Sequence, residues 1–406
     1  MRALNQRFLL PLLVAVVGSS PAHLFVFRQS KEPPKLVRPE FGSSLRALKW
    51  DPLKQTAREL RATTAPQSQG DDSIMLKTLL VVLDVLVVEG KTNRVINGLG
   101  KDDFVVIEDD RRQNTAEVAL APAAALPRSI ILIIDYSGSQ IPFLEKSVAA
   151  AKILIDQLGP RDKMAIVNDD VKLLADFTQD KEELEKTLDG LKKHPGKGRS
   201  LQFSALLAAL RELTDEETRS IIIFQTDGDQ CVALRDQPGA ERHFQEYGRA
   251  EFGLSDVYAA AERSSATVYS VVTNGKLIGV PPEQAAQTAR DAIKKTEIAR
   301  IGRVVSFGPV LESHVRDWIA ALVPGQNAMA RTAALTSGIT AFLDRPEQAN
   351  EIYSMILNDM AHRYVITYYP DNMEPDRERR KVKVEVRGHP EYIVHSRRSY
   401  YYRPPG

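Results

Sequence analysis

The sequence predicts an α/β protein with a doubly wound, mostly parallel sheet at its centre and a small accessory β domain built from the two flanks. Short apolar segments rich in β-branched residues alternate with segments of helical periodicity through the middle of the 406-residue chain. This alternation is typical of a parallel sheet with helices on both faces. On either side the period changes to two, which indicates half-buried strands. Hydrophobic residues make up 43% and charged residues 26%, a composition that argues against global disorder.

The N-terminus has the pattern of an export signal. Arg2 and Arg7 form a basic region, residues 8–17 are apolar, and the small residues that follow suit cleavage after Ala22. We therefore expect a signal peptide at residues 1–22 and an exported protein, located in the periplasm, the cell envelope or the extracellular medium. An uncleaved membrane anchor is the alternative.

The segments beside the central domain differ in character. Residues 23–73 are polar and rich in proline, and we expect a disordered linker. Residues 74–126 hold apolar strands between polar turns, but three strands are too few to bury a core alone. We therefore expect them to pack with strands of the C-terminal flank, residues 363–406. The strands predicted in the two flanks are 76–88, 104–108, 115–120, 364–369, 381–387 and 392–395.

The central domain is predicted at residues 127–362. Its strands are short and apolar, except for one with polar residues on both sides, which is typical of a sheet edge. The predicted strands are 129–134, 164–168, 220–225, 267–273 and the edge strand 171–176. The predicted helices are 141–158, 181–192, 201–213, 254–264 and 351–361.

Two long segments interrupt this alternation, at residues 229–253 and 274–324. Each follows a strand, so both are expected near the carboxyl edge of the sheet. Residues 284–299 within the second have helical spacing. Loops of this length in a compact domain are usually functional or disordered, and we treat both segments as insertions into the domain.

Polar residues follow the predicted strands at the ends where ligands of such folds bind. The loop Asp135-Tyr136-Ser137-Gly138-Ser139 follows an apolar strand, and Asp227 follows another. Ser200 precedes a helix in the same part of the fold. Because the carboxyl ends of parallel strands meet at one edge of the sheet, we expect these side chains to lie together.

The set offers two carboxylates and three hydroxyls, which are the hard oxygen ligands that Mg²⁺ and Mn²⁺ prefer. We predict a metal site whose ligands are Asp135, Ser137, Ser139, Ser200 and Asp227. In the alternative, the two carboxylates only accept hydrogen bonds from the amides of strand ends and helix N-termini.

These residues resemble a von Willebrand factor type A domain with its metal-ion-dependent adhesion site. The resemblance covers about residues 127–361 and implies a Rossmann-like α/β fold. The flanks resemble a narrower group, the exported bacterial von Willebrand factor A-related proteins typified in acidobacteria. Residues 102–109 look like the strand and turn before the domain in that group, and residues 364–370 look like the strand after it.

The resemblance implies a function in adhesion. In such a site the two carboxylates leave the cation partly uncompensated, so that it accepts a Glu or Asp carboxylate from a partner protein. The sequence departs from the family at Ser200, where a Thr is usual, and Arg199 adds a positive charge beside it. Serine lacks the methyl group that stiffens the threonine rotamer, and both features weaken the predicted metal binding.

Three functions follow from the sequence. The leading hypothesis is an exported protein that binds a partner protein through a divalent cation, Mg²⁺ or Mn²⁺. The second is a metal-independent scaffold that binds through the insertions. The third is a hydrolase with its site in the insertions. No nucleophile elbow, P-loop or metal-ligand spacing of histidines supports an enzyme, and we expect none.

The net charge and the cysteine content each exclude one further feature. The formal net charge of +1 gives no bulk attraction to nucleic acid. Cys231 is the only cysteine, so an intramolecular disulfide is impossible.

Overall fold

The computed structural model describes residues 40–60, 80–92, 94–120, 127–193, 195–196, 198–214, 218–232, 234–237, 249–301, 309–372 and 379–401. The predicted signal peptide at 1–22 and residues 238–248 of the first predicted insertion lie outside these ranges. Within the described residues, no helix combines the length and the apolar character needed to cross a membrane.

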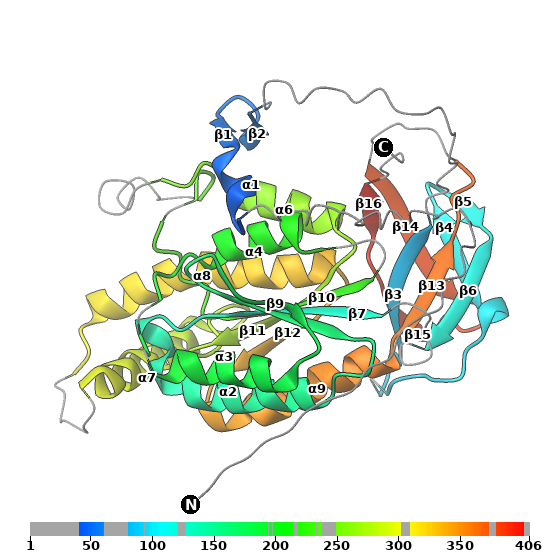
Figure 1. The fold of residues 1–406 in the computed structure, drawn as a ribbon. Coiled ribbons are helices and arrows are strands. Elements are labelled where there is room, and N and C mark those ends of the chain that lie inside the picture. The colour runs from blue at the N-terminus through cyan, green and yellow to red at the C-terminus, as the bar shows by residue number, and fades with distance from the viewer. Residues whose placement is uncertain are drawn as a thin grey trace, which may run out of the picture. The chain divides into compact units, whose positions relative to one another are not determined.

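A six-stranded sheet lies at the centre of the protein, with the strand order β12-β11-β10-β7-β8-β9 (Figure 1). Neighbouring strands are parallel, except that the edge strand β9 runs antiparallel to β8. The doubly wound, mostly parallel architecture is therefore confirmed. The strands are β7 (Arg128–Ile134), β8 (Lys163–Asn168), β9 (Lys172–Thr178), β10 (Arg219–Thr226), β11 (Thr267–Thr273) and β12 (Thr340–Leu343).

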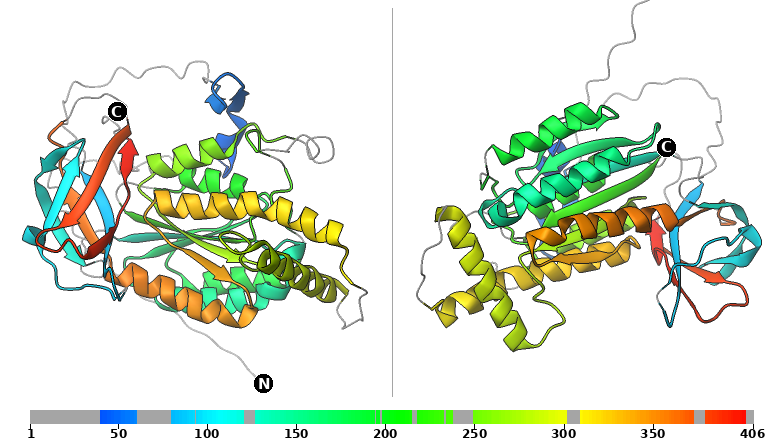
Figure 2. Two further views of the ribbon diagram at one scale, coloured as in Figure 1. Left: turned by 180° about the vertical axis from the view of Figure 1, so that it is seen from behind. Right: turned by 90° about the horizontal axis from the view of Figure 1, so that it is seen from below.

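Helices cover both faces of this sheet, which explains why its central strands are mostly apolar (Figure 2). Every residue of β10 and of β11 is buried. Two separate hydrophobic clusters form, one on each face. The first face carries α2 (Ile141–Asp156), α3 (Lys181–Lys192) and α9 (Ala349–His362). The second carries α4 (Gln202–Glu212), α6 (Leu254–Arg263) and α8 (Glu312–Leu335).

The segment predicted as an insertion, residues 274–324, holds two helical parts. Its first half includes α7 (Pro282–Ile301), close to the predicted helix, and its second half is the first part of α8, whose Val315 and Leu322 pack with α7 in a separate cluster, whereas Ala328 and Met329 of α8 pack on the sheet. No helix was predicted at residues 312–335. The helix there, α8, continues through Pro324 and Gly325, two residue types that usually end a helix. A Cβ at Gly325 would overlap the backbone of Gly228, so glycine lets α8 pass close to the loop after β10.

Strands from the two flanks pair in two four-stranded antiparallel sheets that pack face to face, as the predicted accessory β domain requires. Their orders are β15-β3-β13-β6 and β16-β14-β4-β5. Valine, isoleucine, tyrosine and phenylalanine side chains from both sheets share one core. The first sheet contains β15 (Tyr392–His395), β3 (Val81–Glu89), β13 (Tyr364–Tyr368) and β6 (Thr115–Leu120). The second contains β16 (Ser399–Tyr401), β14 (Arg379–Val386), β4 (Phe104–Glu108) and β5 (Arg111–Gln113).

This sandwich lies at the amino ends of the parallel strands. Asp84 of β3 accepts hydrogen bonds from Arg219 Nε at 2.9 Å and from Thr267 Oγ1 at 3.1 Å, and these residues begin β10 and β11. The backbone carbonyl of Asp84 also accepts from Ser337 Oγ at 3.2 Å. The carboxyl edge of the sheet, where ligands were expected, is thus at the other end of the strands.

The linker predicted for residues 23–73 is wrong over residues 40–60. There the chain forms α1 (Ser43–Arg46) and a hairpin of β1 (Leu48–Asp51) and β2 (Thr56–Glu59). Leu48 is buried among the apolar residues on the second face of the sheet. The polar composition gave no sign of this packing, because hydrogen bonds hold much of the segment. Glu212 of α4 accepts hydrogen bonds from the backbone N–H groups of Gly42 and Ser44 at 2.8 and 2.9 Å.

Candidate metal site

The loop after β7 places its carboxylate and hydroxyls at the carboxyl edge of the sheet. Asp135 and Ser137 are buried, and Ser139 is half-buried. The backbone N–H of Ser137 donates to Asp135 Oδ1 at 2.8 Å, which folds the loop back on the strand end. The Oγ atoms of Ser137 and Ser139 lie 3.4 Å apart, so the two hydroxyls meet on one side of the loop.

Asp227 meets this loop from the neighbouring strand β10. It is fully buried, and its Oδ1 accepts from the backbone N–H of Asp229 at 3.1 Å. Its Oδ2 accepts from Asn274 Nδ2 at 2.9 Å, and the same amide lies 3.3 Å from the carbonyl of Ser139. Asn274 follows β11 and has a φ of +61°, a left-handed conformation that asparagine tolerates better than most residues. It ties the loops after three adjacent strands together.

Ser200 is held at this edge of the sheet by hydrogen bonds of its backbone N–H and C=O groups. Its N–H donates to Asp169 Oδ2 at 2.8 Å, and its carbonyl accepts from Cys231 N–H at 2.8 Å. No hydrogen bond joins its hydroxyl to the other four predicted ligands among the described residues. Its φ of +54° lies in the left-handed region. The structure therefore brings Asp135, Ser137, Ser139 and Asp227 together and leaves Ser200 beside them.

Two residues that the sequence did not single out donate to Asp135, and a third joins the neighbouring loops. Thr226 Oγ1 and Gln202 Nε2 donate to its Oδ2 at 2.8 and 3.1 Å. Asp169 accepts from the Tyr136 N–H at 3.3 Å as well as from Ser200, and so joins two loops. Asp169 follows β8, which lies next to β7. Asp227 was selected because it follows a strand of the parallel sheet, and the same criterion would have selected Asp169.

Comparison with known proteins finds likeness only among solved structures. No family model matches the sequence, and no curated protein matches it. A conserved hypothetical protein, BatB from Bacteroides thetaiotaomicron, is 19% identical over 58% of this chain and 98% of its own, with a TM-score of 0.33. The vWF domain of the type V pili tip protein Mfa5 from Porphyromonas gingivalis is 13% identical over 58% of this chain and 95% of its own, with a TM-score of 0.34.

A third similar structure is the manganese-loaded TRAP protein of Plasmodium vivax. It is 12% identical over 72% of this chain and 97% of its own, with a TM-score of 0.31. A von Willebrand factor domain is thus among the structures that this chain resembles. At such identities and TM-scores the likeness says nothing about function, which depends on the residues of the site.

The electrostatics of the site favour a cation. Burial, followed by the negative charges of Asp169 and Asp227, raises the pKa of Asp135 well above its usual value. Burial also raises the pKa of Asp169 to about 6, and burial with the charge of Asp227 does the same for Asp229. Among the described residues, every hydrogen-bond donor to Asp135 and Asp227 is a neutral amide or hydroxyl. Within this part of the chain the carboxylates thus lie near one another without a positive partner, an arrangement that a bound cation relieves.

Arg199 does not supply that positive charge. Its Nε lies 3.6 Å from Asp170 Oδ1, and its backbone N–H donates to the same oxygen at 2.9 Å. The guanidinium expected to weaken metal binding is therefore directed at a carboxylate outside the predicted ligand set.

The residues of this edge fit a hard divalent cation of the type expected of a von Willebrand factor type A domain. No group of three or more His, Cys, Asp or Glu side chains among the described residues is arranged to hold a metal. A cation here would therefore be held by the carboxylates of Asp135 and Asp227 with the hydroxyls of Ser137 and Ser139. Such an all-oxygen donor set suits Mg²⁺ or Mn²⁺ better than Zn²⁺, whose protein sites usually contain His nitrogen or Cys sulfur.

Proposed function

We propose that this chain is an exported von Willebrand factor type A domain protein that binds a partner protein through a divalent cation, Mg²⁺ or Mn²⁺. The ligands are Asp135, Ser137, Ser139 and Asp227, with Ser200 at the rim. The observation that carries the proposal is the pair of buried carboxylates at the ends of adjacent strands, which meet two hydroxyls and only neutral donors.

The same ligand set explains why the cation binds a partner. Asp135 accepts three hydrogen bonds and Asp227 accepts two, so each carboxylate shares its charge with neutral donors. The bound cation keeps an affinity for a further oxygen anion, which a Glu or Asp side chain of the partner supplies. Binding of this kind breaks no covalent bond, and the proposed function is not enzymatic.

Capture of a partner tests this function. The purified chain is immobilised and exposed to an extract of the cell envelope in Mg²⁺ and, separately, in a chelator. We expect proteins retained in Mg²⁺ and released by the chelator. Asp135→Asn keeps the shape of the side chain and should lose this retention, because the cation loses one of its two carboxylates. Glu145→Gln removes an exposed carboxylate from α2 and is the matched control.

Two results decide between the hypotheses. Retention that survives both the chelator and Asp135→Asn would contradict the cation mechanism and favour the metal-independent scaffold. Loss of retention in Glu145→Gln as well would mean that net charge, and not the site, governs capture.

A further inference from the structure

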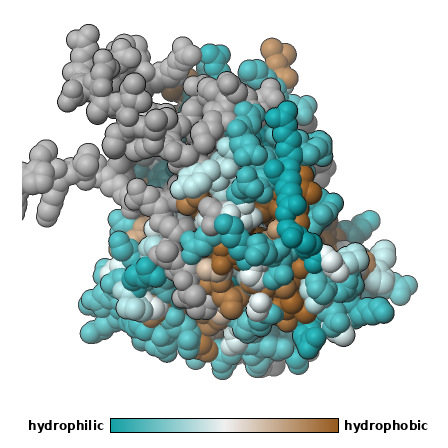
Figure 3. Space-filling view, turned by 90° about the vertical axis from the view of Figure 1, so that its right-hand side faces the viewer, coloured by the Kyte–Doolittle hydropathy of each residue, from teal (hydrophilic) through white to brown (hydrophobic). Residues whose placement is uncertain are grey.

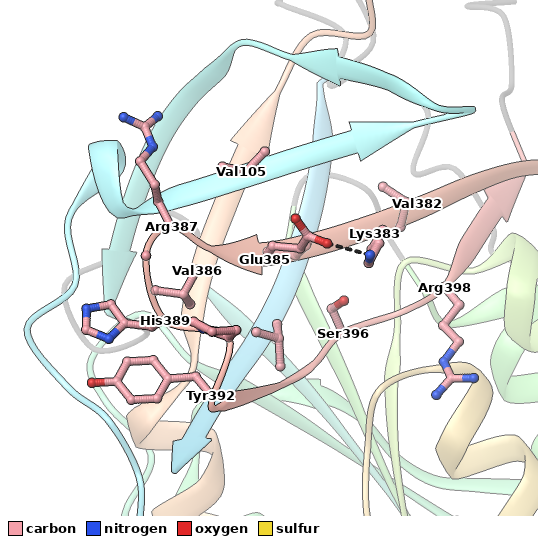
Figure 4. Close-up of a pocket in the computed structure, with 14 residues that line it drawn as sticks. Val105, Val382, Lys383, Glu385, Val386, Arg387, His389, Tyr392, Ser396 and Arg398 are labelled. Carbon is pink, nitrogen blue, oxygen red and sulfur yellow. Dashed lines mark ion pairs between the residues drawn. The ribbon is translucent and has the colours of Figure 1, made fainter. Parts of the chain in front are cut away.

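The open side of the β-sandwich contains a groove that the proposed metal site does not use. The two sheets are connected there by the turn between β14 and β15, and a cavity of about 930 Å³ lies between these strands (Figure 4). Among the described strands, β15 pairs only with β3. β14 pairs with β4 along residues 382–386, but β16 covers its other edge only at residues 379–381.

Among the described residues, none pairs with the backbone of Val384 on the groove side. The N–H of Val382 donates to the carbonyl of Arg398 at 2.9 Å, and the N–H of Arg387 donates to Asp103 on the opposite side at 2.7 Å. Backbone groups alternate in direction along a strand, so Val384 directs its N–H and C=O into the groove. No described strand lies beside it there. An edge of this kind accepts an added strand.

The side chains of the groove are apolar inside and charged outside. Val384, Val386 and Val394 line its inner side, next to the core of the sandwich. Hydrophobic residues gather between hydrophilic ones on this face of the molecule (Figure 3). An occupant therefore needs apolar side chains toward the sandwich and polar ones toward water.

The charges that remain on the rim are positive. Lys383 and Glu385 form an ion pair, whereas no ion pair involves Arg387 or Arg398 among the described residues. Both arginines are exposed. Beyond Arg398 the groove continues into a second cavity of about 500 Å³, which adds Arg331 and Arg379. Arg379 pairs with Glu262 at 2.7 Å. The groove is thus complementary to an acidic occupant.

We propose that an extended acidic segment of a partner protein adds to β14 as a strand and fills this groove. Arg398 stands beside Val382 and Arg387 follows the strand, so the backbones of the two arginines are separated by roughly 16 Å of extended chain. Carboxylates at positions i and i+4 of the segment, about 13 Å apart, are within reach of the two long arginine side chains, and apolar residues at i+1 and i+3 face the valines. The groove is at the amino ends of the parallel strands, so it works without the metal site.

Synthetic peptides test this specificity on the full-length chain. The probe is acetyl-Thr-Glu-Val-Thr-Val-Glu-Thr-amide with a fluorescent label, and its binding is followed by anisotropy in a chelator, which excludes the metal site. A second peptide has the same composition in the order Thr-Glu-Glu-Thr-Val-Val-Thr. A third is the probe with N-methyl groups on its three central amides, which removes its backbone donors. The protein variants are Arg398→Glu and the control Arg112→Glu, which reverses an exposed charge on β5.

We expect saturable binding of the probe and binding at least about tenfold weaker for both altered peptides. Arg398→Glu should weaken binding of the probe by about tenfold, because it replaces an attraction with a repulsion, and Arg112→Glu should not. Absence of saturable binding, equal binding of the N-methylated peptide, or no effect of Arg398→Glu would each overturn the proposal. A dimer that the probe does not dissociate would also overturn it, since a second copy would then occupy the groove.

Discussion

At the scale of single residues, the site depends on a few positions whose backbone conformation the sequence could not reveal. Asp135 and Asp227 were recognisable because each follows an apolar strand. Asp169 follows a strand too, but it stands beside Asp170, and nothing in the sequence says which of the two turns inward. In the structure Asp169 joins two loops while Asp170 pairs with Arg199. Gln202 and Asn274 were unpredictable for a similar reason, because their contacts with carboxylates depend on tertiary packing.

Ser200 gives a prediction at this scale. Its φ of +54° is costly for a β-branched residue, so the structure reverses the expectation that threonine would improve the site. Ser200→Thr should lower the free energy of unfolding in a chelator by about 1–2 kcal/mol. Ser200→Gly should not lower it, because glycine adopts this conformation freely. Urea unfolding of the three proteins measures the difference. A Ser200→Thr variant as stable as the wild type would contradict the strain.

At the scale of elements, the predicted strands and helices with continuous periodicity match the structure closely. The strand at 267–273 and the helix at 181–192 have the predicted bounds. The errors fall where local signals and packing disagree: α8 was not predicted, because Pro324 and Gly325 interrupt its helical pattern, and β16 is too short to show a period. The hairpin at 48–59 has mostly polar or exposed residues, so its contacts with α6 left no apolar pattern to detect.

The junction between the sandwich and the central sheet gives a second prediction. Burial alone would raise the pKa of Asp84, but the charge and hydrogen bond of Arg219 outweigh it and hold the pKa below its usual value. The carboxylate therefore contributes stability above its unfolded pKa, and this contribution is lost as the pH falls through the lower folded pKa. Asp84→Asn leaves Arg219 buried without its partner and should cost roughly 3 kcal/mol or more at pH 7.

Denaturant unfolding from pH 7 to pH 2 measures this effect. The difference between wild type and Asp84→Asn should shrink at the acid end, where the wild type loses the same charge. Glu117→Gln, an exposed carboxylate on β6, is the control and should stay within about 0.5 kcal/mol of the wild type. A difference for Asp84→Asn that does not depend on pH would contradict the charged pair.

At the scale of the whole molecule, the chain carries two candidate binding sites at opposite ends of its parallel strands. The carboxyl edge gathers acidic residues and hydroxyls, and the sandwich at the amino ends presents arginines around an unpaired strand edge. The fold class could be predicted because alternation of strands and helices extends over most of the chain. The groove could not, because it depends on where β14 and β15 separate into different sheets.

The central claim is that the carboxyl edge binds a divalent cation. Calorimetric titration of Mn²⁺ into the metal-free, full-length chain tests it most directly. We predict saturable binding of about one ion per chain, lost in Asp135→Asn and in Asp227→Asn and retained in Glu145→Gln. Saturating ion, at about 100 times the Kd, should also stabilise the wild type by about 2.7 kcal/mol. The absence of binding heat in the wild type, or binding by the two aspartate variants as tight as that of the wild type, would contradict the claim.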